Sequence, residues 1–587
     1  MINPIEKKTT FLQVILIVIL GVIIYINCSD GGFIWDDHGL IQDNEYIKSW
    51  SSFPIIISTG FGAGGNSGFY RPLQSILQMS GYSWWGLQVT GYHLISIFTH
   101  ILAAVIFYFF LRNIFQDKKI AFLASLLFLS SPINTEAVCY ISGLSDPLAL
   151  VFMLACLIFY LKSITGKNTN LYFLALICFI LALLSKENAV VLPLLVLLYH
   201  YAFGIKPQIK KLLPIFAVLS GYILLRLFVL SPPELLGLTV PVLWSRVPVF
   251  FAGITEYLRI ILLPFNLHVE YASQLFRFTD PKVILGAIWV FLLVVFSFFV
   301  KKSRPGLFFA GAWFLITLIP VSNIYPISQA FIMEHYLYVP ALGFFMFLAI
   351  LLNYPVKNGV FAFFLRLFII SLLLLYSFLT LKQTSYWKYP LFFYKRTLQY
   401  APESWRFYNE LGIEYADAGN HSEAETAYQE ALNINPDAAG VYHNLINLYK
   451  KTGDREKLWA VEKTANASRT RLSGQYSRMA SELQAVGRYA EGLLVLKQAL
   501  ELDQKNLNLS NDLASAYVLT GKYQDAVALL RRILVISPDS ALAYNNLAVA
   551  HYYLKQYDLA IENINKAIIR KYPVEPELIE LLKPYNK

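Results

Sequence analysis

The chain has 587 residues and a formal net charge of +10, and 56% of its residues are hydrophobic. Its mean hydropathy of +0.50 excludes an ordinary soluble protein and is typical of a polytopic membrane protein. The positive charge does not indicate nucleic-acid binding, because Lys and Arg collect in the cytoplasmic loops of membrane proteins and no basic run resembles a nucleic-acid arm. The long apolar runs stop after about residue 382, so we predict a membrane part followed by a soluble part.

Neither the first apolar stretch nor the cysteines indicate a functional site. Lys7 and Lys8 precede an apolar run of about 17 residues with no clear cleavage site, which predicts an uncleaved first helix, a signal peptide being the alternative. The four cysteines are Cys28, Cys139, Cys156 and Cys178. They form no CxxC pair, so neither a disulfide framework nor a zinc site is predicted.

About eleven stretches are long and apolar enough to span a membrane. They lie near 11–27, 91–112, 120–137, 146–162, 171–185, 189–204, 211–230, 282–300, 306–321, 335–353 and 359–381. Basic residues occupy alternate connections, at 112–119, 162–167, 206–211, 301–304 and 357, and with Lys7 and Lys8 they predict a cytoplasmic N-terminus. An odd number of crossings then predicts that the last third of the chain is extracytoplasmic.

Two segments do not fit a simple series of spans. The stretch 245–265 is apolar but contains Glu256 and Arg259, and counting it as a span would place the basic loop 301–304 outside. We therefore predict an interfacial or re-entrant helix there. The long external segment 28–90 is rich in Gly, Ser and aromatic residues, which predicts short amphipathic helices at the membrane interface.

The soluble part repeats with a period of 34 residues. Gly419, Gly453, Gly487 and Gly521 are each 34 apart. Small residues recur with the same period at 431, 465, 499 and 567. Glycine in a turn and small residues where paired helices touch are typical of tetratricopeptide repeats. We predict five repeats over 404–573, the second and third degenerate, stacked into an α-solenoid with a concave groove and followed by a tail at 574–587.

One position of the repeat suggests a binding role. Asn409, His443, Ser477, Asn511 and Asn545 are equivalent by this period and lie on the first helix of each repeat. Amide side chains both donate and accept, so such a row could hold an extended acceptor polypeptide with little regard for its sequence. The alternative is a solvated helix face.

Six polar strings of the membrane part all fall in external loops under this topology. They lie at 35–38, 70–73, 132–138, 143–146, 184–188 and 334–338. Strings placed at random would divide between the two faces, and ionisable groups near hydrocarbon are usually kept for function. The pattern therefore favours a single site on the outer face.

At these strings the chain resembles the transmembrane and tetratricopeptide-repeat O-mannosyltransferases, in a bacterial version, and more distantly the protein O-mannosyltransferases. The residues that carry the resemblance are the acidic pair at 36–37, Arg-Pro-Leu at 71–73, Thr-Glu-Ala-Val at 135–138, Ser-Lys-Glu at 185–187, Tyr-Leu-Tyr-x-Pro at 336–340 and the trailing repeats. The resemblance implies an all-α GT-C fold, with a polytopic glycosyltransferase domain over 1–390 in the inner membrane, periplasmic repeats, and a sugar on a polyprenyl phosphate as donor. Ser131, Asn134 and His335 depart from the family pattern, so the sugar need not be mannose.

The residue types suit this chemistry. A hydroxyl acceptor loses a proton as it attacks the anomeric carbon, and Asp36, or else Asp37, is the predicted base. The departing lipid phosphate needs cations. The predicted donor-binding residues are Arg71, Lys186, Glu187, Arg226, His335, Asp146 and Glu136. A divalent cation, Mg or Mn, would be held by Asp36 and Asp146. A single displacement inverts the anomeric configuration.

Each of these residues also has a structural interpretation. One acid of the pair, or Asp146, caps a helix start. Lys186 and Glu187 pair with each other, and Arg71 and Arg226 reach lipid headgroups.

The predicted function is transfer of a sugar to Ser or Thr of translocated proteins that the repeats recruit. One alternative keeps the enzyme but gives it a glycan or lipid acceptor, with the repeats docking a partner protein. Deleting residues 404–587 distinguishes these two. A second alternative is a membrane-anchored scaffold without activity, in which Asp36→Asn and Asp37→Asn change nothing.

Overall fold

The computed structural model describes residues 4–58, 69–166, 168–229, 240–271, 275–325, 331–355 and 358–585, without the side chains of 4–5, 228–229 and 240–242. Helices and turns make up these residues, and no strand occurs among them, which confirms the predicted all-α fold. The chain divides into two compact units, Met1–Glu414 and Tyr415–Lys587. Lys167, Lys357 and the glycines of 60–68 lie outside the described residues.

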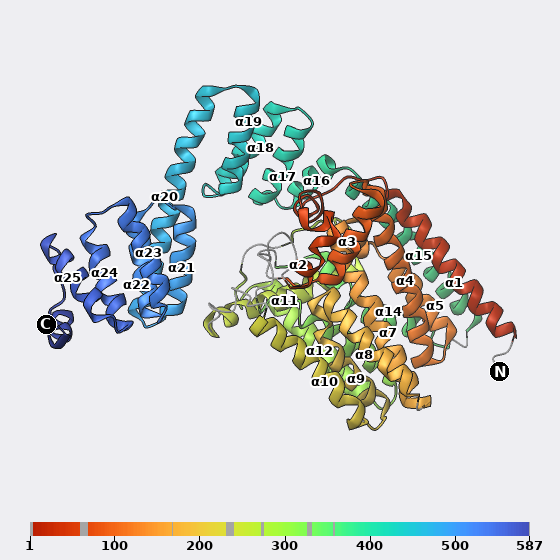
Figure 1. Cartoon of the computed structure of the whole chain (residues 1–587). Helices are drawn as coiled ribbons and strands as arrows, with labels where there is room; N and C mark the ends of the chain where they lie inside the picture. Colours follow the sequence, from red (N-terminus) through yellow and green to blue (C-terminus); the bar gives the residue numbers. More distant parts are fainter. Residues whose placement is uncertain are drawn as a thin grey trace. The chain divides into compact units, whose positions relative to one another are not determined.

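The first unit is a bundle of apolar helices (Figure 1). Its first half comprises α1 (Pro4–Tyr25), α2 (Phe53–Ser58), α3 (Pro72–Trp85), α4 (Val89–Phe115), α5 (Lys118–Ser130), α6 (Thr135–Cys139), α7 (Ser145–Gly166) and α8 (Thr169–Ser185). Its second half comprises α9 (Leu192–Phe203), α10 (Ile209–Leu224), α11 (Val240–Leu262), α12 (Pro281–Val300), α13 (Pro305–Leu318), α14 (Ala341–Leu352), α15 (Gly359–Lys388) and α16 (Pro390–Tyr400).

Length and composition qualify five helical stretches of the described chain as membrane spans. They are Glu6–Cys28, Val89–Phe115, Ile141–Gly166, Pro281–Val300 and Gly359–Lys388. A sixth is the pair Lys118–Ser130 and Pro132–Cys139, bent by 56° at Pro132, whose ring removes a backbone donor. Four shorter apolar helices lie at Thr169–Ser185, Glu187–Phe203, Pro305–Leu318 and Ala341–Leu352. Ten of the eleven predicted spans coincide with these helices. The described part of the other, 211–229, lies on α10 and the turn that follows it, which are not among them, so the count of eleven stays a prediction.

Several basic connections in the described part of the chain contact other connections or helix ends of this bundle. The Glu6 carboxylate lies 3.1 Å from both Arg112 and Lys118, so the start of α1 meets the α4–α5 connection. Lys211 donates to the Ser163 carbonyl at 2.7 Å, and the Lys301 ammonium lies 3.1 Å from the centre of the Tyr201 ring. These contacts join connections far apart in sequence, as the predicted topology requires.

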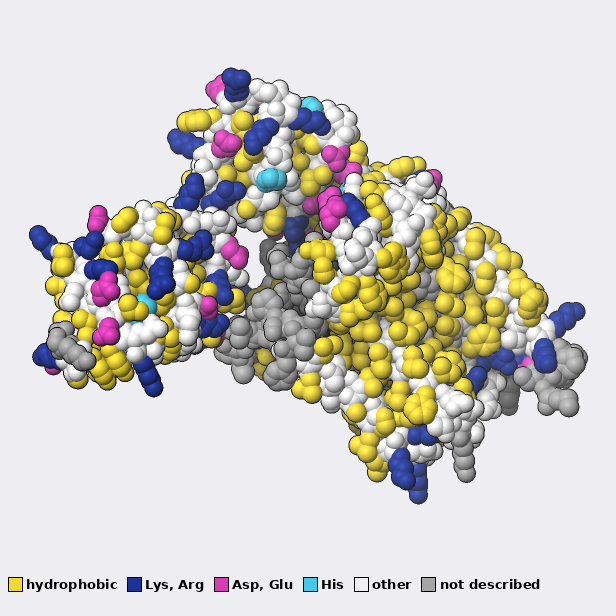
Figure 2. All heavy atoms as spheres, in the orientation of Figure 1, with side chains coloured by type: hydrophobic (Ala, Val, Ile, Leu, Met, Phe, Trp, Pro, Cys, Tyr) yellow, Lys and Arg dark blue, Asp and Glu magenta, His cyan; other side chains and the backbone are white. Residues whose placement is uncertain are grey.

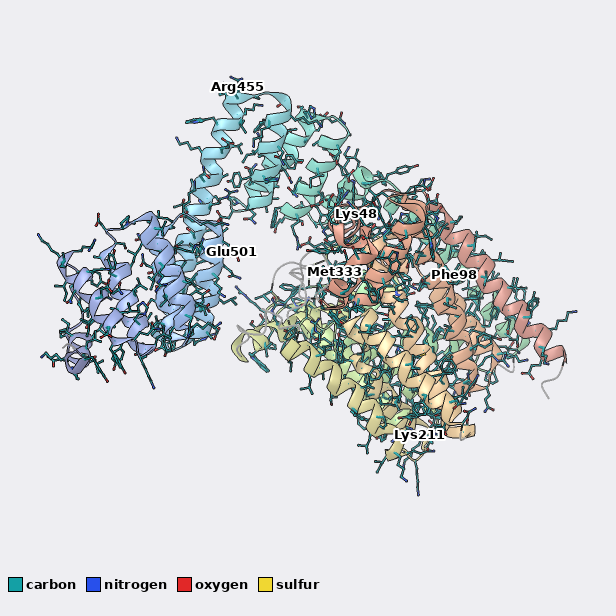
Figure 3. The ribbon with its side chains drawn as sticks, viewed as in Figure 1. Lys48, Phe98, Lys211, Met333, Arg455 and Glu501 are labelled. Atoms are coloured by element: carbon teal, nitrogen blue, oxygen red, sulfur yellow. The ribbon has the colours of Figure 1, made fainter. Side chains whose placement is uncertain are left out.

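One end of the bundle carries the long segment that follows α1. There Asp30 pairs with Lys388 at 2.7 Å, which joins the end of α1 to the end of α15. Figure 3 shows Lys48 and Met333 toward this end and Lys211 at the opposite one. On the face that Figure 2 shows, hydrophobic side chains predominate between the two ends, and Lys and Arg side chains gather at the Lys211 end. This distribution is that of a protein embedded in a bilayer.

The segment predicted as interfacial or re-entrant differs from a re-entrant loop. Residues 240–262 form one continuous helix, α11, which packs beside α12. Its charged residues are accommodated within the bundle, because the buried Glu256 carboxylate accepts from Arg259 and, at 3.2 Å, from Lys282. Paired charges of this kind let a helix with ionisable residues pack against apolar neighbours.

The second unit is a series of paired helices. It holds the end of α17 (Trp405–Asp417), α18 (His421–Ile434), α19 (Ala439–Thr452), α20 (Arg455–Ala485), α21 (Tyr489–Leu502), α22 (Leu507–Leu519), α23 (Tyr523–Ile536), α24 (Ala541–Tyr553), α25 (Tyr557–Ile569) and α26 (Pro576–Leu582). The recurring glycines follow the first helix of a pair. Gly453, for example, caps α19 with φ +77°, a left-handed conformation that suits glycine.

The degenerate repeats differ from the predicted helix–turn–helix pattern. A single helix, α20, takes the place of the second helix of repeat two and the first helix of repeat three (Figure 1). Pro436 and Pro538 stand in the turns between repeats, whereas the equivalent position within α20 is Thr470. A residue other than proline permits the helix to continue but does not require it, because Gln504 occupies the same position after α21, which ends at Leu502.

Candidate active site

The two adjacent aspartates have different surroundings. Asp37 is buried, with an exposed fraction of 1%, and its carboxylate accepts three hydrogen bonds. The Ser142 backbone N–H donates to Oδ1 at 2.8 Å, the Ser142 hydroxyl at 2.5 Å, and the Ile34 N–H to Oδ2 at 3.2 Å. Asp36 is exposed, and its Oδ2 accepts a hydrogen bond of 2.8 Å from the Tyr140 hydroxyl. Asp36 is thus the carboxylate that an incoming hydroxyl can reach, and Asp37 fixes the loop.

Both carboxyl groups are harder to ionise than a free aspartate. Burial raises the pKa of Asp37 to about 7, although the hydrogen bonds from Ser142 and Ile34 oppose that rise. Burial among protein atoms also raises the pKa of Asp36, and the hydrogen bond from Tyr140 opposes it. The Asp36 side chain nevertheless remains open to solvent.

Three cations from distant parts of the chain act on Asp36. The charges of Arg406, His335 and Arg71 each lower the pKa of its carboxyl. Arg71 immediately precedes α3, His335 lies in the 3-10 turn Glu334–Leu337, and Arg406 lies in the first turn of α17. These three residues therefore lie within electrostatic range of the Asp36 carboxyl, although they come from distant parts of the chain.

Three of the four predicted basic residues pair with an acid that was itself predicted. Arg71 forms a two-pronged pair with Glu187, with N–O distances of 2.5 and 3.1 Å. Lys186 Nζ lies 2.6 Å from Asp146 Oδ2, and both side chains are buried. These acids hold the cations in fixed positions, because a planar guanidinium fits a carboxylate along two parallel bonds.

The third pair joins a loop to the bent helix. The Glu136 carboxylate, which is fully buried, accepts from the His335 backbone N–H at 2.8 Å and from its ring Nδ1 at 2.7 Å. The neighbouring Glu334 is buried too, and Tyr271 donates to it at 2.6 Å. Burial, together with the negative charge of Glu136, raises the pKa of Glu334 well above its usual value.

Arg226 lies in the π-helical turn Leu225–Val229 that ends α10. The charges of Glu187, Arg226 and Arg71 all act on the hydroxyl of Tyr222, one turn earlier. Arg226 therefore belongs to the same charged group as the Arg71–Glu187 pair.

Sequence reasoning missed the aromatic residues of the site. Tyr140 stacks against Trp35, with ring centres 5.7 Å apart, while its hydroxyl holds Asp36. The only signal in the sequence was the position of Tyr140 and Ser142 between two strings already identified. Arg406 carried no signal at all, because it lies in the first repeat, outside the expected membrane domain.

An apolar groove of about 800 Å³ opens between α11, α12, α13 and α14. Trp289, Phe296, Phe314 and Phe347 line it, among other residues, and Arg259 and Lys282 stand at its polar part beside Glu256. The Arg259 guanidinium lies 5.9 Å from the centre of the Tyr271 ring, whose hydroxyl bonds Glu334 next to His335. Direct contacts thus connect the charged end of the groove to the site.

The acids are not arranged as a metal centre. Asp36 is bonded to Tyr140 and Asp146 to Lys186, and among the described residues no group of three or more His, Cys, Asp or Glu side chains could hold a metal ion. The predicted divalent cation therefore stays a prediction, and no step below is assigned to one.

The predicted row of polar residues in the repeats is uneven. His443 is exposed and bonds Asn447, and Asn545 is half-buried. Asn409 donates to its neighbour Glu410 and lies in the first unit. Asn511 differs from the prediction, because it is only 3% exposed and donates to the Leu507 carbonyl of its own helix.

Comparisons with known proteins match both parts of the chain. Residues 77–233 match the family of dolichyl-phosphate-mannose-protein mannosyltransferases. Residues 412–453, 483–547 and 541–568 match tetratricopeptide repeats. The chain is also 25% identical over 446 residues to a protein O-mannosyl-transferase of Caenorhabditis elegans, a match that covers 72% of this chain and 63% of that protein.

The chain is a relative of the transmembrane and tetratricopeptide-repeat O-mannosyltransferases. This confirms the resemblance that the sequence motifs carried. Human protein O-mannosyl-transferase TMTC3 is 25% identical over 500 residues, which cover 76% of this chain and 54% of the human protein. The chain thus spans less than two thirds of the length of these relatives.

Among solved structures, the tetratricopeptide-repeat protein YrrB is similar to part of the chain. It covers 33% of this chain and 98% of its own length, with 17% identity and a TM-score of 0.18.

Proposed function

We propose that the chain is a membrane glycosyltransferase that moves mannose, or a related hexose, from a polyprenyl phosphate to a Ser or Thr hydroxyl. The observation that carries the proposal is the accessible carboxylate of Asp36 within electrostatic range of Arg71 and His335 at one end of an apolar bundle. The match of residues 77–233 to mannosyltransferases supports the reaction type and the sugar.

In this reaction Asp36 is the base. Its carboxylate takes the proton of the acceptor hydroxyl as the oxygen attacks the anomeric carbon. The bond between that carbon and the phosphate oxygen breaks, and the lipid phosphate leaves with the bonding electrons and a second negative charge. One displacement from the opposite face inverts the anomeric configuration. Asp37 holds the loop of Asp36 through its bonds to Ser142 and Ile34.

The leaving phosphate needs positive charge, which fixed cations supply without reorganisation. Arg71 and Arg226 are suited to this role, because both lie by Glu187 and Tyr222 in one charged group. Glu187 keeps the Arg71 guanidinium in place through its two-pronged pair. His335, held by Glu136, supplies a further positive charge when protonated.

The groove between α11 and α14 suits the lipid tail of the donor. Aliphatic and aromatic side chains form its walls. At its polar part Arg259 and Lys282 both pair with one buried carboxylate, Glu256, which leaves an excess of positive charge. A polyprenyl phosphate has the same distribution of apolar tail and anionic head. Arg259 contacts Tyr271, whose hydroxyl donates a hydrogen bond to Glu334. These contacts connect the proposed position of the donor head group to the site.

Replacing Lys282 tests this placement. Lys282→Gln is expected to raise the KM for the lipid donor about two- to five-fold with kcat unchanged, the effect of one partly exposed charge. Glu256 keeps its bond to Arg259, so the fold is preserved. The measurement is initial rate against donor concentration.

Lys302→Gln is the matched control, because Lys302 is an exposed lysine just past the other end of α12. Equal changes in donor KM for the two variants would contradict the placement of the lipid.

The pH dependence of transfer provides a second test. A base must be ionised, so kcat/KM rises with pH through the pKa of Asp36, which burial raises. The rise is therefore expected above pH 4, the usual pKa of an aspartate. Burial raises the pKa of Asp37 to about 7, so this neighbour is mostly uncharged below that pH. Asp37→Asn is therefore expected to leave the start of the rise in place, whereas a rise that persists in Asp36→Asn would contradict the assignment of the base.

The basic connections support a cytoplasmic location for the Lys211 end of the bundle by the positive-inside rule, and we propose that the site faces the outer leaflet of the inner membrane. The repeats then lie in the periplasm, where they recruit the acceptor polypeptide and raise its local concentration at the site.

A divalent cation remains a separate proposal, tested by adding Mg²⁺ or Mn²⁺ to chelator-treated protein.

The decisive experiment is a transfer assay with the purified full chain in lipid nanodiscs. Radiolabelled polyprenyl-phosphate mannose, glucose and galactose are offered with a library of Ser- and Thr-containing peptides. Label on peptides, lost in Asp36→Asn, supports the proposal. Label on a glycan or lipid alone would move the acceptor to the alternative class, and no consumption of any donor would overturn the function.

A further inference from the structure

The residue before the predicted base has a strained backbone. Trp35 has φ +57°, a left-handed conformation that bulky side chains rarely adopt. Such strain persists only where the surrounding contacts fix it, and it is most often found at functional sites. Because Trp35 and Asp36 are consecutive, the backbone of Trp35 sets the direction of the Asp36 carboxylate.

The contacts that fix Trp35 come from the far end of the first unit. The Trp35 N–H donates to the Tyr394 hydroxyl at 2.7 Å, and Tyr394 lies in α16. The centre of the Trp35 ring lies 5.5 Å from that of Phe407, which belongs to α17, the first helix of the first repeat. Tyr394 and Phe407 are both buried and also contact each other.

The same cluster holds the residue that bonds Asp36. The Tyr140 ring lies between Trp35 and Trp387, with ring centres 5.7 and 6.0 Å away. Trp387 in turn packs on Phe393 of α16 at 4.5 Å. Aromatic packing thus fixes both the backbone that carries Asp36 and the hydroxyl that donates to it.

Polar and charged contacts hold the segment around the start of α17 against the rest of the first unit on both sides of the aromatic cluster. Near its start, Ser404 and Arg406 bind the buried Glu270 carboxylate at 2.8 and 3.2 Å. One helical turn beyond Glu410, Glu414 lies 3.5 Å from the ring of His38, two residues after Asp36. Residues 405–414 therefore belong to the first unit, although the repeat pattern includes them.

We propose that α16 and the start of α17 are a clamp that positions the catalytic base, with Tyr394 and Phe407 as positioning residues acting through Trp35. The inference rests on the proposed role of Asp36 as base. It means that the first repeat contributes to the chemical step and not only to the recruitment of acceptor. A deletion of 404–587 consequently removes part of the catalytic unit and does not isolate recruitment.

The test compares two tyrosine variants of the full chain. Tyr394→Phe removes the hydroxyl that accepts from Trp35, whereas Tyr442→Phe removes one that donates to the Pro436 carbonyl at 2.9 Å in the second repeat. Both tyrosines are buried, so the two changes are chemically matched. With a short acceptor peptide at saturation, Tyr394→Phe is expected to lower kcat about tenfold with little change in peptide KM, and Tyr442→Phe to leave kcat unchanged.

Hydrogen exchange provides a readout independent of activity. Mass spectrometry of the segment 33–38 is expected to show faster amide exchange in Tyr394→Phe than in wild type and no change in Tyr442→Phe. Equal kcat losses in both variants, a change confined to peptide KM, or unchanged exchange at 33–38 would overturn the clamp. A wild-type protein that transfers no sugar would refute the proposed function, and the exchange measurement would still decide the clamp.

Discussion

Asp36→Asn is expected to lower kcat for sugar transfer on the order of 10²–10⁴-fold, the range for loss of a general base. The amide has nearly the shape of the carboxylate and can still accept from the Tyr140 hydroxyl, so the loop stays in place. It cannot accept the proton of the acceptor. Donor KM is expected to change little, because the donor phosphate contacts cations elsewhere in the site. Turnover of radiolabelled donor at saturating peptide measures both parameters.

Two further substitutions define what this result means. Asp43→Asn, an exposed acid in the same external segment, is the control for charge alone and should keep wild-type turnover. Asp37→Asn should reduce kcat less than Asp36→Asn, because its amide oxygen still accepts from the Ser142 N–H. If Asp36→Asn kept more than a tenth of the wild-type turnover, or if Asp37→Asn were the more severe change, Asp36 would not be the base.

The sequence contained enough information to find most of this site. Charged residues are rare in the apolar part of the chain, so each one that interrupts the pattern carries information. Asp36, Arg71 and Glu187 lie far apart in sequence, yet the alternation of basic loops assigned them to one face. The structure brings them together at one end of the bundle.

The partners of these residues could not be predicted. Nothing in the sequence says that Lys186 pairs with Asp146 and Arg71 with Glu187, although Lys186 and Glu187 are neighbours in the chain. Pair choice depends on helix rotation and tilt, which packing of the whole bundle decides. The left-handed backbone of Trp35 was hidden for the same reason, since tertiary contacts impose it against local preference.

The repeats show the limit of a periodic pattern. The period of 34 gave the helix pairs of unit two, because glycine turns and small contact residues recur wherever two helices meet. It could not show that α20 continues through two repeats, or that residues 405–414 pack in the first unit. Both depend on what fills the space around the helix, which a repeat pattern does not record.

The largest effect on stability is expected at the buried pair of Lys186 and Asp146. Their side chains are only 5% and 2% exposed, and Nζ lies 2.6 Å from Oδ2. Lys186→Met leaves the Asp146 carboxylate buried without its cation, which costs about 3–5 kcal/mol. Thermal unfolding in detergent should show a clear drop in Tm, and transfer should fall with it.

The double variant Lys186→Met/Asp146→Leu distinguishes a role of this ion pair in stability from a role of Lys186 in binding the donor. Replacing a whole buried pair by apolar residues of similar volume is often neutral, so Tm should return close to that of wild type. We expect sugar transfer to return as well, because Arg71 keeps its two hydrogen bonds to Glu187 and its hydrogen bond of 3.4 Å to the Ser145 hydroxyl. Glu187 and Ser145 are the chain neighbours of the two replaced residues. The pair then acts as a brace between the starts of α7 and of the turn at Glu187. A stable double variant whose donor KM is raised tenfold or more would instead show that Lys186 contacts the lipid phosphate itself.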